Sequence, residues 1–263
     1  MASDTRFIEF SSRDDIDGGS PNSSFTINLF NTIPEIRERV IGLSLESLSV
    51  SNVHPNVSPL KGIGNTIYLT VDGGSTQEIS VPEGYYSVYT LTTQIQALID
   101  ANIELSADNT SIEWIPLPTA RFQFTSDSGL SVTEGPAAED ESTLYTSMGY
   151  LKNETSAGLA PSLPDLTGLK SVQVHSKQIS SIGTQSVDGD GTLSTLIHTI
   201  PVNVPWGATQ AFKSDTIQPQ VYYGHQNQDL DMTTFDITLR DENGVQLVLG
   251  GSHVNGVFKA WVG

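Results

Sequence analysis

The sequence contains no cysteine among its 263 residues. This absence excludes disulfide bonds, thiolate metal sites and cysteine nucleophiles. No apolar run approaches the roughly 20 residues that a membrane-spanning helix needs. The first ten residues also lack the basic region and apolar run of a signal peptide. We therefore expect a soluble protein with no membrane span, synthesised inside a cell.

Basic residues are scarce, with 12 against 30 acidic residues and a formal net charge of −18. Such a surface repels phosphate backbones and anionic membranes, so we expect no general nucleic-acid binding. The charge is uneven, because residues 100–163 hold ten acidic residues against only Arg121 and Lys152. We interpret this segment as a solvated acidic face.

Sequence motifs for catalysis are also missing. The chain has no GxSxG elbow, no Walker A loop and no HExxH pair. Its histidines show no tight ligand spacing: they are His54, His175, His198, His225 and His253. We therefore predict that the protein is not an enzyme, and we nominate no catalytic residue, no cofactor, no cofactor-binding residue and no metal ligand. Carboxylate pairs of the glycosidase type stay open, because such partners need not be near in sequence.

One short segment resembles part of a calcium loop. Asp188 and Asp190 alternate with Gly189 and Gly191. The segment lacks a third closely spaced ligand and the distal glutamate of an EF-hand. Because Asp-Gly pairs are also ordinary turn residues, the sequence leaves open whether Asp188 and Asp190 bind a cation.

A period of two residues dominates the chain and predicts β-strands. Phe25, Ile27 and Leu29 alternate with polar residues. The alternation that begins at residue 41 slips by one residue near Glu46 and Ser47, which predicts a β-bulge. Further alternation predicts a hairpin around Asn243-Gly244, with arms at 235–239 and 245–249, and a last strand at 257–262.

Residues 88–101 have a helical period, with Val88, Leu91, Ile95, Leu98 and Ile99 on one stripe. Ser87 or Thr90 is the expected N-terminal cap, and Asn102 the expected end. The signal then weakens, with short strands expected at 112–115 and 121–125 and an acidic loop at 134–142.

These patterns predict an all-β fold, a jelly-roll β-sandwich with one helix and an acidic insertion. We expect an N-terminal arm at 1–22 and a single jelly-roll domain at 23–263, with an elaboration at about 103–160. The helix should pack across an end or edge of the sandwich, and an independent second domain is the disfavoured alternative.

Several short blocks, taken in order, resemble one family of proteins. They include Ser20–Ile27, Asn65–Leu69, Ile79–Ser87, Ser147–Tyr150, Pro164–Gly168, Ile200–Val202, Pro205–Gly207 and Ile237–Gly244. Their order resembles the minor capsid, or penton, proteins of double-jelly-roll viruses. This family includes those of virophages, Polinton-like viruses and giant algal viruses.

The resemblance implies a viral structural protein of the virion, made inside the host cell, that forms a homo-pentamer at the five-fold vertices of an icosahedral shell. It also implies contact with trimers of the double-jelly-roll major capsid protein. At 263 residues this chain is short for a major capsid protein itself. We expect the acidic segment to project outward, because it would be repelled by a packaged genome.

Two alternatives stay open. The first is a carbohydrate- or receptor-binding jelly-roll head of a virus or phage, and the second is a sandwich-fold enzyme. The sequence alone identifies neither the virus nor the residues of a subunit interface.

Overall fold

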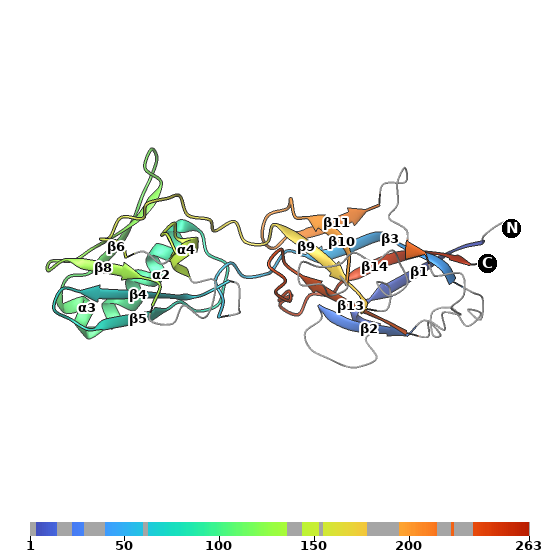
Figure 1. Cartoon of the computed structure of the whole chain (residues 1–263), viewed down its shortest axis with the longest axis horizontal. Coiled ribbons are helices and arrows are strands. Elements are labelled where there is room, and N and C mark those ends of the chain that lie inside the picture. The colour runs from blue at the N-terminus through green and yellow to red at the C-terminus, as the bar shows by residue number, and fades with distance from the viewer. Residues whose placement is uncertain are drawn as a thin grey trace. The chain divides into compact units, whose positions relative to one another are not determined.

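The structure is a computed structural model that describes residues 4–14, 23–28, 40–59, 63–135, 144–152, 155–177, 195–214, 222–223 and 234–262 (Figure 1). The chain divides into two compact units. The first comprises residues 1–54 and 169–263, and the second comprises residues 55–168. The second unit is therefore an insertion between two parts of the first.

Two antiparallel sheets make up the first unit. The β1 sheet has the order β1 (Asp4–Ser11), β14 (Asn255–Val262), β3 (Val40–Ser51) and β11 (Thr209–Lys213), and β12 (Tyr222–Tyr223) also pairs with β3. The β2 sheet has the order β10 (Leu196–Pro201), β9 (Ser171–His175), β13 (Thr234–Arg240) and β2 (Ser24–Asn28). A short 3₁₀ helix, η1 (Ser12–Asp14), follows β1.

The order of these strands is that of a jelly roll. With β12 set aside, the eight strands numbered along the chain lie in the orders 1-8-3-6 and 2-7-4-5. The chain crosses between the sheets at every connection except that from β9 to β10, which are neighbours in one sheet. Two sheets joined in this way form an eight-stranded jelly roll. The predicted all-β jelly-roll class is confirmed.

Apolar side chains from both sheets meet in one core. The Phe10 ring stacks on Phe258 within the β1 sheet at 5.2 Å and lies 6.1 Å from Phe25 of the β2 sheet. Val172 and Val174 of β9 are fully buried in the same cluster. Because each strand gives every second side chain to this core, the alternation of the sequence matches the sandwich.

The predicted bulge lies at Glu46. Val257 of β14 pairs with Ser47, but the next residue, Phe258, pairs with Leu45, so Glu46 has no cross-strand partner on β14. Leu45 and Leu48 consequently both face the core, although they are three residues apart.

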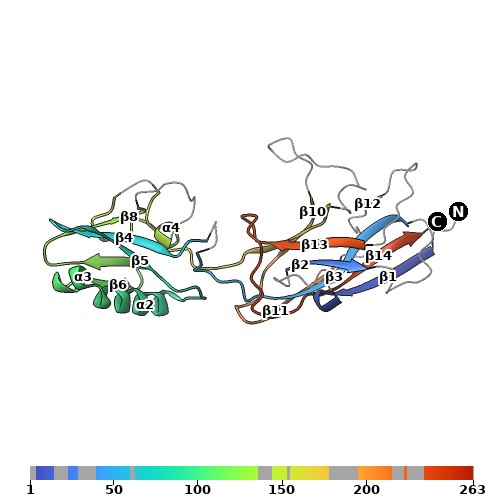
Figure 2. The ribbon, with the colours of Figure 1, turned by 90° about the horizontal axis from the view of Figure 1, so that it is seen from below.

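The described part of the second unit contains eight elements. They are β4 (Thr66–Val71), β5 (Thr76–Ser80), α2 (Val88–Ala101), α3 (Ile103–Ala107), β6 (Ser111–Ile115), β7 (Arg121–Thr125), β8 (Leu130–Thr133) and α4 (Leu144–Ser147). The strands form a three-stranded sheet, β5-β4-β8, and a hairpin, β6-β7. Single bridges from Ser156 to Val132 and from Leu159 to Gln123 connect the sheet and the hairpin to one later segment of the chain. Figure 2 shows α2 and α3 along one side of these strands.

Helix α2 agrees with its prediction in bounds and in caps. The Ser87 side chain accepts the Thr90 N–H, and the Thr90 side chain accepts the Ser87 N–H, so the two residues form a capping box. Asn102 ends α2 and also caps α3. Leu91, Ile95 and Ile99 are the buried residues of the stripe. The short strands predicted at 112–115 and 121–125 correspond to β6 and β7.

The predicted N-terminal arm at 1–22 is wrong over the part that the structure describes. Residues 4–11 form β1, which pairs with β14 along its whole length. Ile8 and Phe10 are buried in the jelly-roll core. The many charged residues of this region suggested an unpacked segment, but the alternation from Phe7 to Phe10 is enough to place two apolar side chains inside. Residues 15–22 lie outside the described part.

The single domain predicted over 23–263 is also corrected. Residues 55–168 enclose their own apolar cluster, which includes the stripe of α2, so this helix packs in the insertion and not across the sandwich. The insertion therefore begins at residue 55 and not near residue 103. Periodicity identifies strands and helices but not which of them share a core, so the sequence pattern alone does not separate the two units.

Candidate interaction surface

The outer face of the β1 sheet carries an unusual group of side chains. Phe7 is 59% exposed. It lies opposite Lys259 of β14, and the Lys259 Nζ atom is 5.2 Å from the centre of the Trp261 ring, a cation–π arrangement. Exposed aromatic side chains are enriched at protein–protein contacts.

A groove of about 460 Å³ crosses the same sheet next to this group. Its lining includes the short side chains of Ser47, Ser49 and Ala211. Gly256 is among the residues that line the groove, and a Cβ atom there would point inward and overlap the Phe10 ring of the core. The packing of Phe10 against β14 therefore requires glycine at this position.

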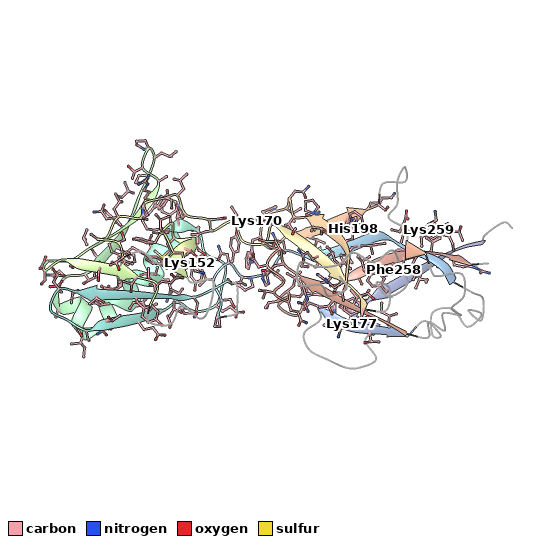
Figure 3. The ribbon with its side chains drawn as sticks, viewed as in Figure 1. Lys152, Lys170, Lys177, His198, Phe258 and Lys259 are labelled. Carbon is pink, nitrogen blue, oxygen red and sulfur yellow. The ribbon has the colours of Figure 1, made fainter. Side chains whose placement is uncertain are left out.

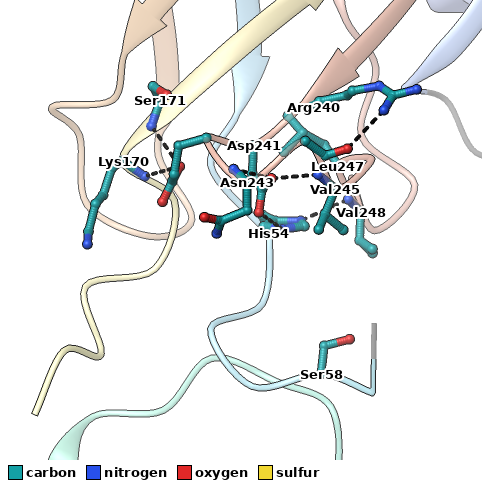
Figure 4. Close-up of polar contacts among 12 residues, drawn as sticks. His54, Ser58, Lys170, Ser171, Arg240, Asp241, Asn243, Val245, Leu247 and Val248 are labelled. Carbon is teal, nitrogen blue, oxygen red and sulfur yellow. Dashed lines mark hydrogen bonds and ion pairs between the residues drawn. The ribbon is translucent and has the colours of Figure 1, made fainter. Parts of the chain in front are cut away.

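A buried carboxylate organises the turn after β13, where Asn243-Gly244 was predicted to form a hairpin (Figure 4). Asp241 Oδ1 accepts the N–H groups of Asn243 at 2.9 Å and Val245 at 2.7 Å. Gly244 has a φ of 80°, which glycine adopts without strain. Burial raises the pKa of Asp241, an effect that the two backbone N–H groups oppose. The predicted turn is present at this site.

The second arm of that hairpin is irregular. It pairs with β13 through one bridge, from Arg240 to Gln246. Two residues after this bridge, the Val248 N–H donates to Nδ1 of His54 at 3.0 Å and not to a neighbouring strand. His54 is 3% exposed and is the last residue of the first segment of the jelly-roll unit. The histidine thus fixes the point where the chain leaves this unit.

The returning chain is held by the same turn. Glu242 Oε2 accepts the N–H groups of Lys170 at 3.2 Å and Ser171 at 3.3 Å, at the start of β9 (Figure 4). Asp241 lies beside His54, where the chain leaves the jelly-roll unit, and the adjacent Glu242 binds the segment where the chain returns. One turn therefore contacts the jelly-roll chain on both sides of the insertion. The role of this network is structural, because its polar atoms point at backbone groups.

The other histidines are dispersed. His175 lies on the polar side of β9, as predicted, with Gln173 at 3.2 Å and Thr195 at 2.9 Å. The His198 ring lies 4.5 Å from that of Phe212, and His253 contacts Ser12. His225 lies outside the described residues. Within the described ranges, no three histidine or acidic side chains are grouped as metal ligands.

Asp188 and Asp190, with the loop that contains them, also lie outside the described residues. Most of the predicted acidic loop at 134–142 does too, since only residues 134 and 135 are described. None of the helices in the described part of the chain combines the length and apolarity of a membrane span.

Charge is divided unequally between the two units. In the full sequence the jelly-roll unit has 16 acidic and nine basic residues, including Lys170, Lys177 and Lys259 (Figure 3). The insertion, which is shorter, has 14 acidic residues against three basic ones, Lys61, Arg121 and Lys152. The acidic character predicted for 100–163 therefore belongs to the whole insertion.

No protein-family model matches the chain, and no curated protein matches it in sequence. Its structure is similar to the crystal structure of a mavirus penton protein, labelled with selenomethionine. The TM-score is 0.52 at 9% sequence identity, over 98% of this chain and 99% of the mavirus chain. At this identity the likeness shows a penton-like fold and nothing beyond the fold.

Proposed function

We propose that the chain is a minor capsid protein, a penton, that forms pentamers at the five-fold vertices of an icosahedral shell. One observation carries the proposal: a jelly roll with an acidic insertion between its third and fourth strands follows a penton protein from end to end. The structural match covers 98% of the chain, so it includes the insertion as well as the sandwich. A match between the jelly rolls alone would leave the insertion out.

The jelly-roll unit supplies surfaces suited to such assembly. Its outer β1-sheet face has a groove and bears Phe7, Lys259 and Trp261. Its formal net charge of −7 is smaller than the −11 of the insertion, so neighbouring capsid subunits approach the jelly-roll unit at a lower electrostatic cost. We propose trimers of a double-jelly-roll major capsid protein as the neighbours at the vertex.

The insertion is proposed to face outward from the shell. Its excess of acidic residues would be repelled by a packaged nucleic acid. On the outside, the same charge keeps particles apart in solution. In this proposal the protein resides in the virion, is made inside the host cell and has no enzymatic activity.

Electron microscopy of the purified full-length chain tests the proposal. After mild cross-linking at high protein concentration, class averages should show rings with five-fold rotational symmetry. Rings of another order, or paired subunits related by a two-fold axis, would contradict it, because a five-fold vertex accepts only a five-fold ring.

A further inference from the structure

The insertion presents one helix surface that is nearly free of charge. The exposed residues of α2 fall on one side of the helix: Tyr89, Thr90, Thr93, Ala97, Asp100 and Ala101. Asp100 is the single charged member, and its Oδ1 accepts a hydrogen bond from Gln96 at 2.7 Å. This is a marked contrast in a unit where 14 of the 17 charged residues are acidic.

Large apolar side chains extend this surface at both ends of α2. Tyr85 precedes the helix and is 38% exposed, Tyr89 is 66% exposed, and Ile103, at the start of α3, is 90% exposed. Together with the exposed residues of α2, Tyr85 and Ile103 form what we call the helix face. Tyrosine-rich surfaces that lack charge are typical of the centre of protein contacts.

A second apolar surface of the insertion follows α4. Leu151, Leu159 and Leu163 are 44%, 42% and 65% exposed. Their segments lie side by side, because the Ser162 N–H donates to the Gly149 carbonyl at 3.0 Å and the Tyr150 hydroxyl donates to the Gly158 carbonyl at 2.6 Å.

Both basic residues described for the insertion lie at these segments. Lys152 follows Leu151 in the chain and lies beside α4 in Figure 3, and an Arg121 Nη1 atom contacts the Ala160 carbonyl at 3.5 Å. We call the three leucines, Arg121 and Lys152 the leucine surface.

The two surfaces are suited to each other and not to themselves. Figure 2 shows α2 and α3 on one side of the insertion and α4 on the other. Two copies of an acidic unit repel each other across most faces, so they approach most easily where acidic charge is sparse. The helix face has one carboxylate, whereas the leucine surface has two cations, so contact between unlike surfaces is electrostatically favourable.

We propose that the helix face of one copy docks on the leucine surface of the next copy. This inference rests on the proposed pentamer. A head-to-tail contact of this kind repeats around an axis and closes into a ring. It would bury exposed apolar side chains of both surfaces. It also assigns the insertions, as well as the jelly rolls, to the subunit interface.

Three variants of the full chain test this contact by sedimentation velocity. Tyr89→Glu adds an acidic residue to the helix face, and Leu159→Glu adds one to the leucine surface. Leu117→Glu is the matched control, because Leu117 is 85% exposed in the turn between β6 and β7, outside both surfaces. We expect the first two variants to weaken association at least about tenfold and the control to leave it unchanged. Thr93→Glu replaces Tyr89→Glu if that variant fails to fold.

Mixing the two variants gives the sharpest outcome. The Tyr89→Glu chain keeps its leucine surface and the Leu159→Glu chain keeps its helix face, so an equimolar mixture should form one-to-one pairs and no rings. Weakened variants that do not pair when mixed would overturn the contact, as would an undisturbed ring in either variant. A wild-type chain that never forms a ring would instead overturn the proposed pentamer, and this contact with it.

Discussion

His54 and Asp241 lie next to each other in the interior of the jelly-roll unit, with Nε2 of the histidine 3.9 Å from Oδ2 of the aspartate. Both side chains are almost fully buried, and each also receives backbone N–H groups from the segment that follows β13. Since His54 is the last residue before the insertion, this pair connects the end of β3 with the turn that holds the start of β9.

Removal of the Asp241 carboxylate should destabilise the jelly roll. Asp241→Ala leaves the N–H groups of Asn243 and Val245 without their acceptor in a buried place, at a cost of about 3 kcal/mol in the free energy of unfolding. Asp241→Asn keeps an acceptor oxygen and should cost about 1 kcal/mol or less. Urea unfolding followed by fluorescence measures both, and equal losses would show that the two hydrogen bonds contribute little.

A comparison of the wild type with Asp241→Asn also predicts how stability depends on pH. Burial raises the pKa of Asp241 above its ordinary value of 3.8, so the folded protein binds this proton more tightly than the unfolded chain does. The stability of the wild type relative to Asp241→Asn should therefore be greatest below pH 3.8. It should fall as the pH rises through the raised pKa and then stay constant. A relative stability that increases over this range would contradict the assigned direction.

Strand β1 should contribute to the core as any other strand does. Ile8→Ala removes a fully buried side chain and should lower the free energy of unfolding by about 3 kcal/mol. Phe7→Ala changes the adjacent residue, which faces outward, and should alter it by about 0.5 kcal/mol or less. Chemical denaturation of the two variants at low protein concentration separates these effects. Small changes in both would favour the loosely packed arm.

The insertion should fold as an isolated fragment of residues 55–168. Its two ends are tied to each other, because Asn56 Nδ2 donates to the carbonyls of Tyr86 and Leu166, each at 2.8 Å. Its apolar cluster, which includes Leu91, Ile95 and Phe122, needs no side chain from the jelly roll. Circular dichroism and urea titration of the fragment should show cooperative unfolding.

Asn56→Ala is the informative variant of this fragment. It removes both donated bonds and the acceptor of the Tyr86 N–H, so it should cost about 3 kcal/mol. A fragment that unfolds without cooperativity would show that the insertion depends on the jelly roll for its structure.

Much of the local structure could be predicted because it depends on neighbouring residues. The bulge at Glu46 is visible as a slip in alternation, and the caps of α2 at Ser87 and Asn102 are short-range hydrogen bonds. The turn at Asn243-Gly244 likewise follows from the conformational freedom of its own residues.

The candidate surfaces could not be predicted in the same way. His54 carries no local sign of burial, since its partners Asp241 and Val248 come from the far end of the chain. The outer face of the β1 sheet joins Phe7 to Lys259 from opposite ends of the sequence. The division into two cores has the same origin, because it depends on which strands meet and not on their individual patterns.

The most direct test of the penton assignment is the native mass of the purified chain across a range of protein concentrations. A penton should form a species of five times 28.3 kDa that grows at the expense of the monomer, with no stable species of intermediate size. A stable dimer or tetramer as the largest species would contradict it.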